Sequence, residues 1–326
     1  VVPILADDLD YRDLSIHGST RVSTPHIDSI AARGVRFTDA YVTASTCSPT
    51  RAGLLTGRYQ QRFGHELNPT VRRDDPNYNL LGLPPGEILL PQLMKNAGYM
   101  TGIVGKWHLG YAPHFMPTSR GFDEFFGFLG SRKTYSQNVY PDVGKLGGEV
   151  EPSPGTAYRD PIGQDRPNIV NRGAEQLVEE REYMTDAFGR EAVDFIERHH
   201  RSPFFLYVAF NAVHEPLQVT QRYIDRVTNV RDPREITYVA MIIALDDAVG
   251  RILDALDRTG LADDTLVIFL GDNGGVFWPE RRNFADNSPL RAGKMYVHEG
   301  GVRVPFMMRW PNHIEAGSVY GQLISS

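Results

Sequence analysis

Three short apolar segments of the chain predict buried β-strands. They span residues 1–6, 204–210 and 265–270, and each is rich in branched or aromatic side chains. Continuous apolar runs of this length are typical of strands that are covered on both faces of a sheet. The residues that come next after these runs are polar: Asp7, Asp8, Asn211, His214, Asp272 and Asn273. Functional chemistry is therefore expected at the ends of these strands.

Amphipathic segments between these runs predict helices. Residues 25–34, 185–199 and 238–256 each place apolar side chains at helical spacing. Strands that alternate with helices predict an α/β sandwich, and such sheets bind ligands outside the carboxyl ends of their strands. Residues 131–182 are polar and rich in Pro, Gly and Asp, without sustained periodicity. They predict a functional loop inserted into the domain.

Composition and charge narrow the classes of protein. The 326 residues suffice for one large α/β domain, and 41% hydrophobic with 23% charged residues is ordinary for a soluble globular protein. No apolar stretch reaches the roughly 18 residues that a transmembrane helix needs. The chain has 34 Lys+Arg against 40 Asp+Glu, which argues against broad nucleic-acid binding. An anionic substrate must therefore be held by local cations.

Both ends of the chain are expected to be truncated. Residues 1–6 begin within a strand, without an initiator Met or a signal-peptide pattern. Residues 321–326 stop as a new element begins. We therefore expect a single catalytic domain over residues 1–326, and the absence of a targeting signal carries no information.

The only cysteine, Cys47, lies in the segment STCSPTRAGLLTG of residues 45–57. A single cysteine excludes an internal disulfide, and a lone one is most often a buried structural residue. This segment, however, resembles the first signature of the type I, formylglycine-dependent sulfatases, in which Cys-x-Pro-x-Arg is followed in register by Leu-Leu-Thr-Gly. The resemblance implies that a maturation enzyme oxidises Cys47 to formylglycine. It also implies the alkaline-phosphatase-like fold, a central, mostly parallel sheet between helices, with a smaller C-terminal subdomain largely absent from this chain.

The expected chemistry explains the use of an oxidised cysteine. A thiolate that attacked sulfur would form an adduct with no easy exit. A hydrated aldehyde carries two hydroxyls on one carbon: one attacks the sulfate ester and expels the alcohol, and deprotonation of the other then ejects sulfate. Arg51 follows Cys47 by one helical turn, so it faces the same site if this segment opens a helix. There it would hold the modified residue, and the helix N-terminus would favour an anion.

Four hard oxygen donors follow two of the predicted strands. Asp7 and Asp8 come after the first strand, and Asp272 and Asn273 after a later one. An Asp-Asp pair alone more often caps a turn, but hard donors without thiolate or imidazole suit calcium or magnesium. In the sulfatases that this chain resembles, the matching pairs bind one divalent cation, usually calcium, together with the formylglycine. Asp10 stands where the family commonly has glycine, which leaves the local turn open.

Residues 98–108, GYMTGIVGKWH, resemble the second sulfatase signature along their whole length. The resemblance implies that Lys106 contacts sulfate and that His108 is the base for the elimination step. A lone lysine is usually a solvated surface charge, but the small Gly105 and the apolar residues before it indicate a strand end. Sulfate spreads its charge over three peripheral oxygens, so several fixed donors are required.

Further positions match the same family. His214 corresponds to a sulfate-binding histidine that protonates the leaving oxygen, and Lys294 to the last sulfate-contacting lysine, although the residues alone leave both open as surface groups. Residues 299–306 predict a glycine turn that leads into a strand. His65 and His298 are candidate contacts to the sugar ring of the substrate.

The substrate class follows from a further resemblance. The stretches around His65 and over residues 109–128 are similar to carbohydrate sulfatases of the arylsulfatase and N-acetylgalactosamine-6-sulfatase type. Sulfated polysaccharide fragments are therefore expected, in preference to small aryl sulfates or steroids, and neither nucleic acid nor a membrane span is expected. The resemblance also implies a periplasmic, secreted or lysosomal location.

Two other functions stay open. A phosphoesterase or phosphonate monoester hydrolase of the same superfamily shares the metal site and sometimes the formylglycine, but the two lysines and two histidines here match the sulfatase pattern. A catalytically silent protein that binds sulfated glycans would leave Cys47 unoxidised, and the complete catalytic set argues against it. The mass of the Cys47 peptide and a sulfate-release assay separate this binding protein from an enzyme.

Overall fold

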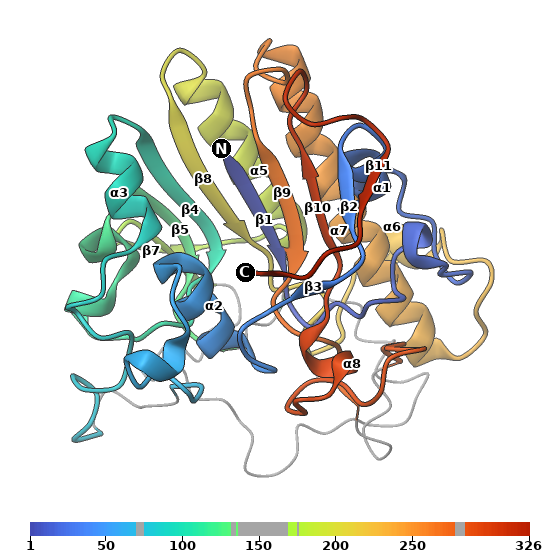
Figure 1. Ribbon diagram of the computed structural model, residues 1–326, viewed down its shortest axis with the longest axis horizontal. Coiled ribbons are helices and arrows are strands. Elements are labelled where there is room, and N and C mark those ends of the chain that lie inside the picture. Colours follow the sequence, from blue (N-terminus) through green and yellow to red (C-terminus); the bar gives the residue numbers. More distant parts are fainter. Residues whose placement is uncertain (70–74, 132–134, 136–168, 175, 278–283) are drawn as a thin grey trace.

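The computed structural model describes residues 1–69, 75–131, 135, 169–174, 176–277 and 284–326. The strands of its main sheet are β1 (Val2–Ala6), β2 (Val35–Phe37), β4 (Met100–Lys106), β5 (Glu124–Phe128), β6 (Ile169–Arg172), β7 (Gln176–Glu179), β8 (Phe204–Ala209), β9 (Val267–Gly271), β10 (Phe306–Arg309) and β11 (Ser318–Tyr320). Within the described residues they form a ten-stranded sheet in the order β11-β2-β10-β9-β1-β8-β4-β5-β6-β7 (Figure 1). A separate pair joins β3 (Ala40–Tyr41) and β12 (Ile324–Ser325).

The middle of the sheet is parallel. Strand β1 pairs in parallel with β8 and β9, and β4 pairs in parallel with β8 and β5. Antiparallel neighbours lie outside this core, with β10 beside β9 and β6 beside β5. The three apolar runs of the sequence form β1, β8 and β9, and β1 and β8 are buried at every position. The prediction of strands covered on both faces is confirmed.

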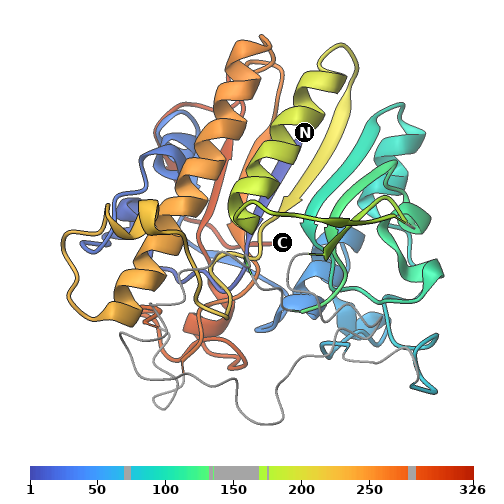
Figure 2. The same cartoon turned by 180° about the vertical axis from the view of Figure 1, so that it is seen from behind.

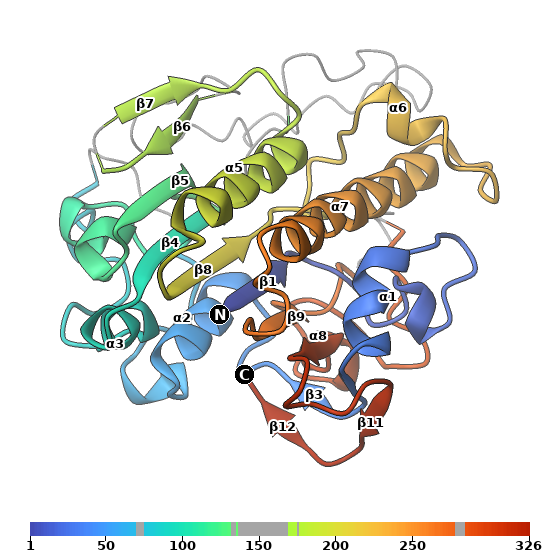
Figure 3. The same ribbon diagram turned by 90° about the horizontal axis from the view of Figure 1, so that it is seen from above.

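Helices lie on both sides of the sheet (Figures 2 and 3). They are α1 (Pro25–Ala32), α5 (Met184–His199) and α7 (Pro233–Arg258) on one side, and α2 (Cys47–Thr56) and α3 (Leu90–Asn96) on the other. The alternation of side chains along β1 serves both layers. Val2 and Ile4 pack into the hydrophobic cluster that contains α1, α5 and α7, whereas Leu5 packs into the cluster that contains Leu55 of α2.

Short elements connect these layers. They are α6 (Gln221–Ile224), α8 (Glu299–Val302), and the 3-10 helices η1 (Ser15–His17), η2 (Gln60–Arg62), η3 (Pro113–Phe115) and η4 (Pro117–Arg120). Among the helices that the structure describes, none combines the length and the apolar character needed to cross a membrane.

The structure departs from the sequence prediction in three segments. Helix α7 begins before the predicted start at Tyr238, because Asp232 caps a polar first turn and its Oδ1 accepts a hydrogen bond from Arg234 N at 2.9 Å. The glycine turn predicted in residues 299–306 is instead the one-turn helix α8, followed by β10. Most of the predicted loop 131–182 lies outside the described residues, and its described end forms the antiparallel pair β6–β7.

Candidate active site

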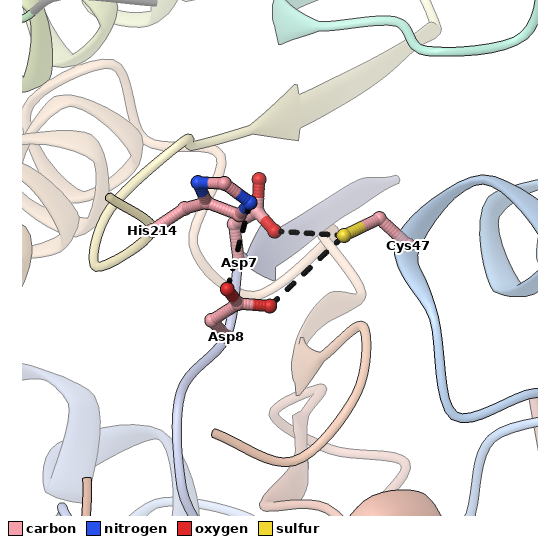
Figure 4. A group of neighbouring side chains, drawn as sticks. All are labelled: Asp7, Asp8, Cys47 and His214. Atoms are coloured by element: carbon pink, nitrogen blue, oxygen red, sulfur yellow. Dashed lines mark hydrogen bonds and ion pairs between the residues drawn. The ribbon is translucent and has the colours of Figure 1, made fainter. Parts of the chain in front are cut away.

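Four parallel strands deliver polar residues to one edge of the sheet. Because β1, β4, β8 and β9 run in the same direction, their carboxyl ends lie together. The residues placed there are Asp7 and Asp8 after β1, Lys106 and His108 at the end of β4, His214 after β8, and Asp272 and Asn273 after β9. Figure 4 shows Asp7, Asp8 and His214 gathered opposite Cys47. One potential ligand atom from each of these four side chains lies within 4.8 Å of the others.

Cys47 is the first residue of α2 and is buried. Its Sγ lies 3.3 Å from Asp7 Oδ1 and 4.0 Å from Asp8 Oδ1. Burial raises the pKa of the Cys47 thiol, and the negative charge of Asp7 raises it further. Since the thiolate is the reactive form of cysteine, these surroundings suppress ordinary thiol nucleophilicity. The unmodified thiol at this position is therefore a poor nucleophile.

Arg51 lies one turn further along α2 and joins three elements of the site. Its Nε and Nη2 donate to Asp272 Oδ2 at 3.1 and 2.8 Å, and its Nη1 donates to the carbonyl of Lys106 at 2.9 Å. Nη2 also lies 3.6 Å from Asp7 Oδ2. The guanidinium is fully buried, so it links α2 to the ends of β1, β4 and β9.

Arg51→Met is expected to lower the free energy of unfolding by about 3–5 kcal/mol, because it leaves buried carboxylates without their partner. The matched control is Arg58→Met, which breaks the pair between the half-exposed Arg58 and Glu87 and should cost no more than about 1 kcal/mol. Urea denaturation of the two variants measures the difference. Equal losses for both variants would contradict the structural role assigned to Arg51.

Two lysines each contact one of the paired aspartates. Lys106 Nζ lies 2.5 Å from Asp7 Oδ2, and Lys294 Nζ lies 2.7 and 2.8 Å from the two oxygens of Asp8. Burial alone lowers the pKa of Lys294, but Asp8 more than compensates and the net pKa is raised, so this side chain stays charged. Burial raises the pKa of Asp8, but the charge of Lys294 brings it well below its usual range. The site thus holds closely paired buried charges.

The predicted metal donors lie next to one another. Asp272 Oδ1 accepts a hydrogen bond from Asp8 N at 3.2 Å, and Asn273 Nδ2 donates to Asp8 Oδ1 at 2.7 Å. Asn273 Oδ1 is buried and has no hydrogen-bond partner within the part of the chain that the structure describes. Burial and the charge of Asp7 raise the pKa of Asp272 to about 6. A cation among these oxygens would relieve their repulsion and satisfy the unpaired amide oxygen, so the residues fit the implied metal.

The closest potential ligand atoms differ in one respect from the predicted metal set. The group that lies within 4.8 Å contains Asp7, Asp8, Cys47 and His214, but not Asp272. Asp272 is instead engaged by Arg51, since its Oδ2 accepts two hydrogen bonds from that guanidinium. His214 comes near because its Nε2 lies 3.6 Å from Asp8 Oδ2.

The two site histidines are both neutral in this geometry but have different surroundings. Burial, followed by the charge of Lys106, brings the pKa of His108 well below the usual value of a histidine, and neither of its ring nitrogens has a hydrogen-bond partner among the described residues. Burial and Lys294 lower the pKa of His214 to about 3. The Nδ1 of His214 lies 2.7 Å from the carbonyl of Glu215, which fixes this nitrogen as the donor and leaves Nε2 facing the site.

Formal charges in the site balance. The buried acids are Asp7, Asp8 and Asp272, and the bases that pair with them are the buried Arg51 and Lys106 and the partly buried Lys294. With all six ionised, the three negative and three positive charges cancel. A divalent cation would therefore leave an excess of positive charge, which an anionic substrate group offsets.

The two histidines suggested as sugar contacts lie in different surroundings. His65 is 6% exposed, and its Nε2 lies 2.7 Å from Ser48 Oγ at the start of α2. His298 is half-buried at the N-cap of α8. Their contact with a substrate stays a prediction.

Two supporting residues were not identified from the sequence. Ser48 Oγ donates to the carbonyl of His108 at 2.5 Å and so ties α2 to the end of β4. Tyr135 is buried, and its hydroxyl lies 2.5 Å from the carbonyl of Asn211 and 2.9 Å from that of His214. Ser48 lies inside the cysteine motif, which is a usable signal, whereas Tyr135 lies in a stretch without periodicity and carries none.

Comparison with known proteins identifies the family. The family model described as Sulfatase matches residues 1–326. The chain belongs to the sulfatase family. It is 37% identical over 332 residues to N-acetylgalactosamine-6-sulfatase of Rattus norvegicus, with 99% of this chain and 59% of the relative covered. It is 32% identical to N-acetylgalactosamine-6-O-sulfatase of Bacteroides thetaiotaomicron, with 97% and 68% covered.

A solved structure has a similar fold over nearly the whole of this chain. Ps i-CgsB, solved in complex with k-i-k-neocarrahexaose, superimposes with a TM-score of 0.85 at 36% identity, and the match covers 99% of this chain and 68% of that one. The predicted resemblance to the type I sulfatases and the predicted alkaline-phosphatase-like fold are confirmed. This sulfatase-family chain spans 59% of the length of the rat relative.

Proposed function

We propose that this sulfatase-family chain hydrolyses O-sulfate esters of carbohydrates through a formylglycine made from Cys47. The observation that carries the proposal is the position of Cys47. Its Sγ lies 3.3 Å from Asp7 at the N-terminus of a helix, where the pKa of its thiol is raised. A thiol is a poor nucleophile there, whereas a neutral hydroxyl on the same carbon would face the acids, lysines and histidines of the site.

Each residue of the site has its own role in the proposed hydrolysis. The modified Cys47 supplies two hydroxyls on one carbon when it is hydrated. Lys106 and Lys294 neutralise the charge of the sulfate group, and Arg51 keeps α2 and the modified residue in register with the strand ends. The ring nitrogens of His108 have no hydrogen-bond partner in the part of the chain that the structure describes, so His108 is the proposed proton acceptor inside the site.

His214 is the proposed proton donor to the departing sugar oxygen. Its Nδ1 is engaged by the carbonyl of Glu215, so its Nε2 is the atom that faces the substrate. Burial and Lys294 lower its pKa to about 3 in the free protein. A bound sulfate brings negative charge and raises that pKa, which couples protonation of His214 to substrate binding.

The cation is proposed to be calcium, held by Asp7, Asp8, Asp272, Asn273 and the modified Cys47. All four unmodified donors offer hard oxygens, which calcium prefers to the nitrogen and sulfur ligands of zinc. When bound, the ion supplies Lewis acidity towards a sulfate oxygen. The unpartnered Oδ1 of Asn273, noted above for the described residues, supports this donor set.

Removal of the cation is expected to abolish activity and lower thermal stability. Calcium at 100 times its dissociation constant should stabilise the fold by about 2.7 kcal/mol, and zinc should substitute poorly. Thermal unfolding in a chelator and then in excess calcium measures this shift independently of turnover. Asp8→Asn should lose the calcium response, while Asp225→Asn, a change on the exposed surface, should keep it. An identical melting temperature with and without calcium would contradict the site.

The substrate class and the partners belong to the same proposal. The names of the rat and bacterial relatives point to 6-sulfated N-acetylgalactosamine as the first compound to test. A formylglycine-generating enzyme is the required partner for maturation, and a periplasmic, secreted or lysosomal site of action is expected. A desulfation screen over defined sulfated oligosaccharides tests the proposal. Faster hydrolysis of matched phosphate or phosphonate monoesters would favour the phosphoesterase alternative.

A further inference from the structure

Lys294 lies in a segment with strained backbone angles, which contacts from other parts of the chain must hold in place. The residues on either side of it have left-handed backbone angles, with φ of 62° at Ala292 and 72° at Met295. Non-glycine residues adopt this region at an energetic cost, and they keep it only where surrounding contacts impose it. One such contact is the hydrogen bond from Met295 N to the carbonyl of Ser45 at 2.8 Å. The other is the peptide of Gly275.

Gly275 forms hydrogen bonds with both of its backbone polar groups: its carbonyl accepts and its N–H donates. Its carbonyl accepts from Lys294 N at 2.8 Å and from Asn287 Nδ2 at 3.2 Å. Its N–H donates to Oδ1 of Asp10. A Cβ at this position would lie 2.0 Å from that same oxygen, so only glycine permits the carboxyl group to approach. Gly275 thus connects Asp10, which its N–H contacts, with the backbone N–H of Lys294, which its carbonyl contacts.

Asp10 is itself fixed to the body of the domain. Its N–H donates to Asp13 Oδ2 at 3.1 Å, and Asp13 Oδ1 accepts from Arg21 Nη2 at 2.6 Å. The hydroxyl of Tyr238, on α7, donates to Asp13 as well. A continuous series of hydrogen bonds therefore runs from α7 through Asp10 and Gly275 to the segment that presents Lys294 to Asp8.

We propose that Asp10 is a positioning residue that fixes Lys294 in the sulfate site through the Gly275 peptide. The proposal rests on the sulfate hydrolysis proposed above, because it assigns Lys294 to the sulfate group. Asp10 does not touch the substrate. It acts by keeping the ammonium of Lys294 where the sulfate oxygens bind, so its loss weakens anion recognition and turnover together.

The first test compares Asp10→Ala with the wild type in two quantities. They are kcat/KM on a sulfated N-acetylgalactosamine oligosaccharide and the inhibition constant of inorganic sulfate as a competitive inhibitor. A misplaced lysine should lower kcat/KM by roughly 10- to 10²-fold and raise the inhibition constant of sulfate. Asp10→Asn keeps a side-chain oxygen for Gly275 N and should restore most of both values. If Asp10→Ala had the same kcat/KM and the same inhibition constant of sulfate as the wild type, the proposal would be wrong.

A double-mutant cycle separates positioning from general damage. In a Lys294→Met background the lysine is gone, so Asp10→Ala should cause no further loss of kcat/KM. An equal penalty in both backgrounds would show that Asp10 acts only on the overall structure and would overturn the proposal. Gly275→Ala, which forces a Cβ against Asp10 Oδ1, should give the same signature and serves if Asp10→Ala unfolds. A wild-type protein that releases no sulfate would instead reject the proposed function.

Discussion

Cys47→Ser is expected to remove turnover while leaving the fold intact. Serine has about the volume of cysteine and can occupy the same buried position at the start of α2. It offers one hydroxyl where the proposed mechanism needs two, so it can accept a sulfate group but has no second hydroxyl to release it. Loss of a covalent nucleophile has cost about 10⁶-fold in kcat in a well-studied hydrolase, and a loss of at least about 10⁴-fold is expected here.

Four measurements on the same preparation test this expectation: circular dichroism, thermal unfolding, mass spectrometry and the rate of hydrolysis. Circular dichroism and thermal unfolding check that the serine variant is folded. Mass spectrometry of the Cys47 peptide should find aldehyde in the wild type and none in Cys47→Ser, and the variant should accumulate a sulfated peptide after exposure to substrate. Hydrolysis by Cys47→Ser at a rate near that of the wild type would rule out the formylglycine mechanism.

His214→Ala is expected to slow hydrolysis of sugar sulfates far more than that of activated aryl sulfates. General acid catalysis contributes typically about 10²–10⁴-fold, and a sugar hydroxyl needs the proton whereas nitrophenol leaves almost without it. The loss should therefore be about 10²–10⁴-fold on the sugar sulfate and much smaller on nitrophenyl sulfate. Because the protonated imidazole is the active form, wild-type activity on the sugar sulfate should also fall as pH rises through the pKa of His214 in the complex.

His108→Ala serves as the matched comparison, since His108 is proposed to act after the alcohol has left. Its loss should affect both substrates to a similar degree and give a burst of alcohol release before turnover stalls. Pre-steady-state kinetics of both variants on both substrates provides the measurement. Equal penalties of His214→Ala on the sugar and aryl sulfates would remove the leaving-group role and leave His214 as a sulfate contact.

The interior of the sheet was predictable from the sequence because burial on both faces leaves a continuous apolar run. Strands β1, β8 and β9 follow those runs closely. The edge pair β6–β7 was not predicted, because β7 is mostly exposed and its sequence carries no apolar pattern. The start of α7 was missed for a related reason, since its first turn is polar and is held by the cap at Asp232. The pattern of apolar residues along the sequence therefore predicts buried elements, but it does not predict elements that are exposed to solvent.

The residues of the candidate site were predictable from the sequence, but the contacts that hold them in place were not. Residues that end parallel strands, such as Asp7 and Asp272, must lie at one edge of the sheet, and the motif around Cys47 supplied the remaining partner. The contacts of Asp10 and Tyr135 were not predictable, because each depends on a partner that is distant in the sequence. Asp10 accepts a hydrogen bond from Gly275, and the hydroxyl of Tyr135 contacts the carbonyl groups of Asn211 and His214. Residues that support the site through distant contacts, such as Asp10 and Tyr135, are thus recognised only in the tertiary structure.

The most direct test of the central claim is the release of inorganic sulfate from a 6-sulfated N-acetylgalactosamine oligosaccharide by protein matured with a formylglycine-generating enzyme. We expect sulfate and desulfated sugar to appear in equal amounts, the reaction to require calcium, and protein with an unconverted Cys47 to be inactive. Sulfate release that is independent of Cys47 conversion, or no release from any sulfated carbohydrate by fully converted protein, would contradict the central claim.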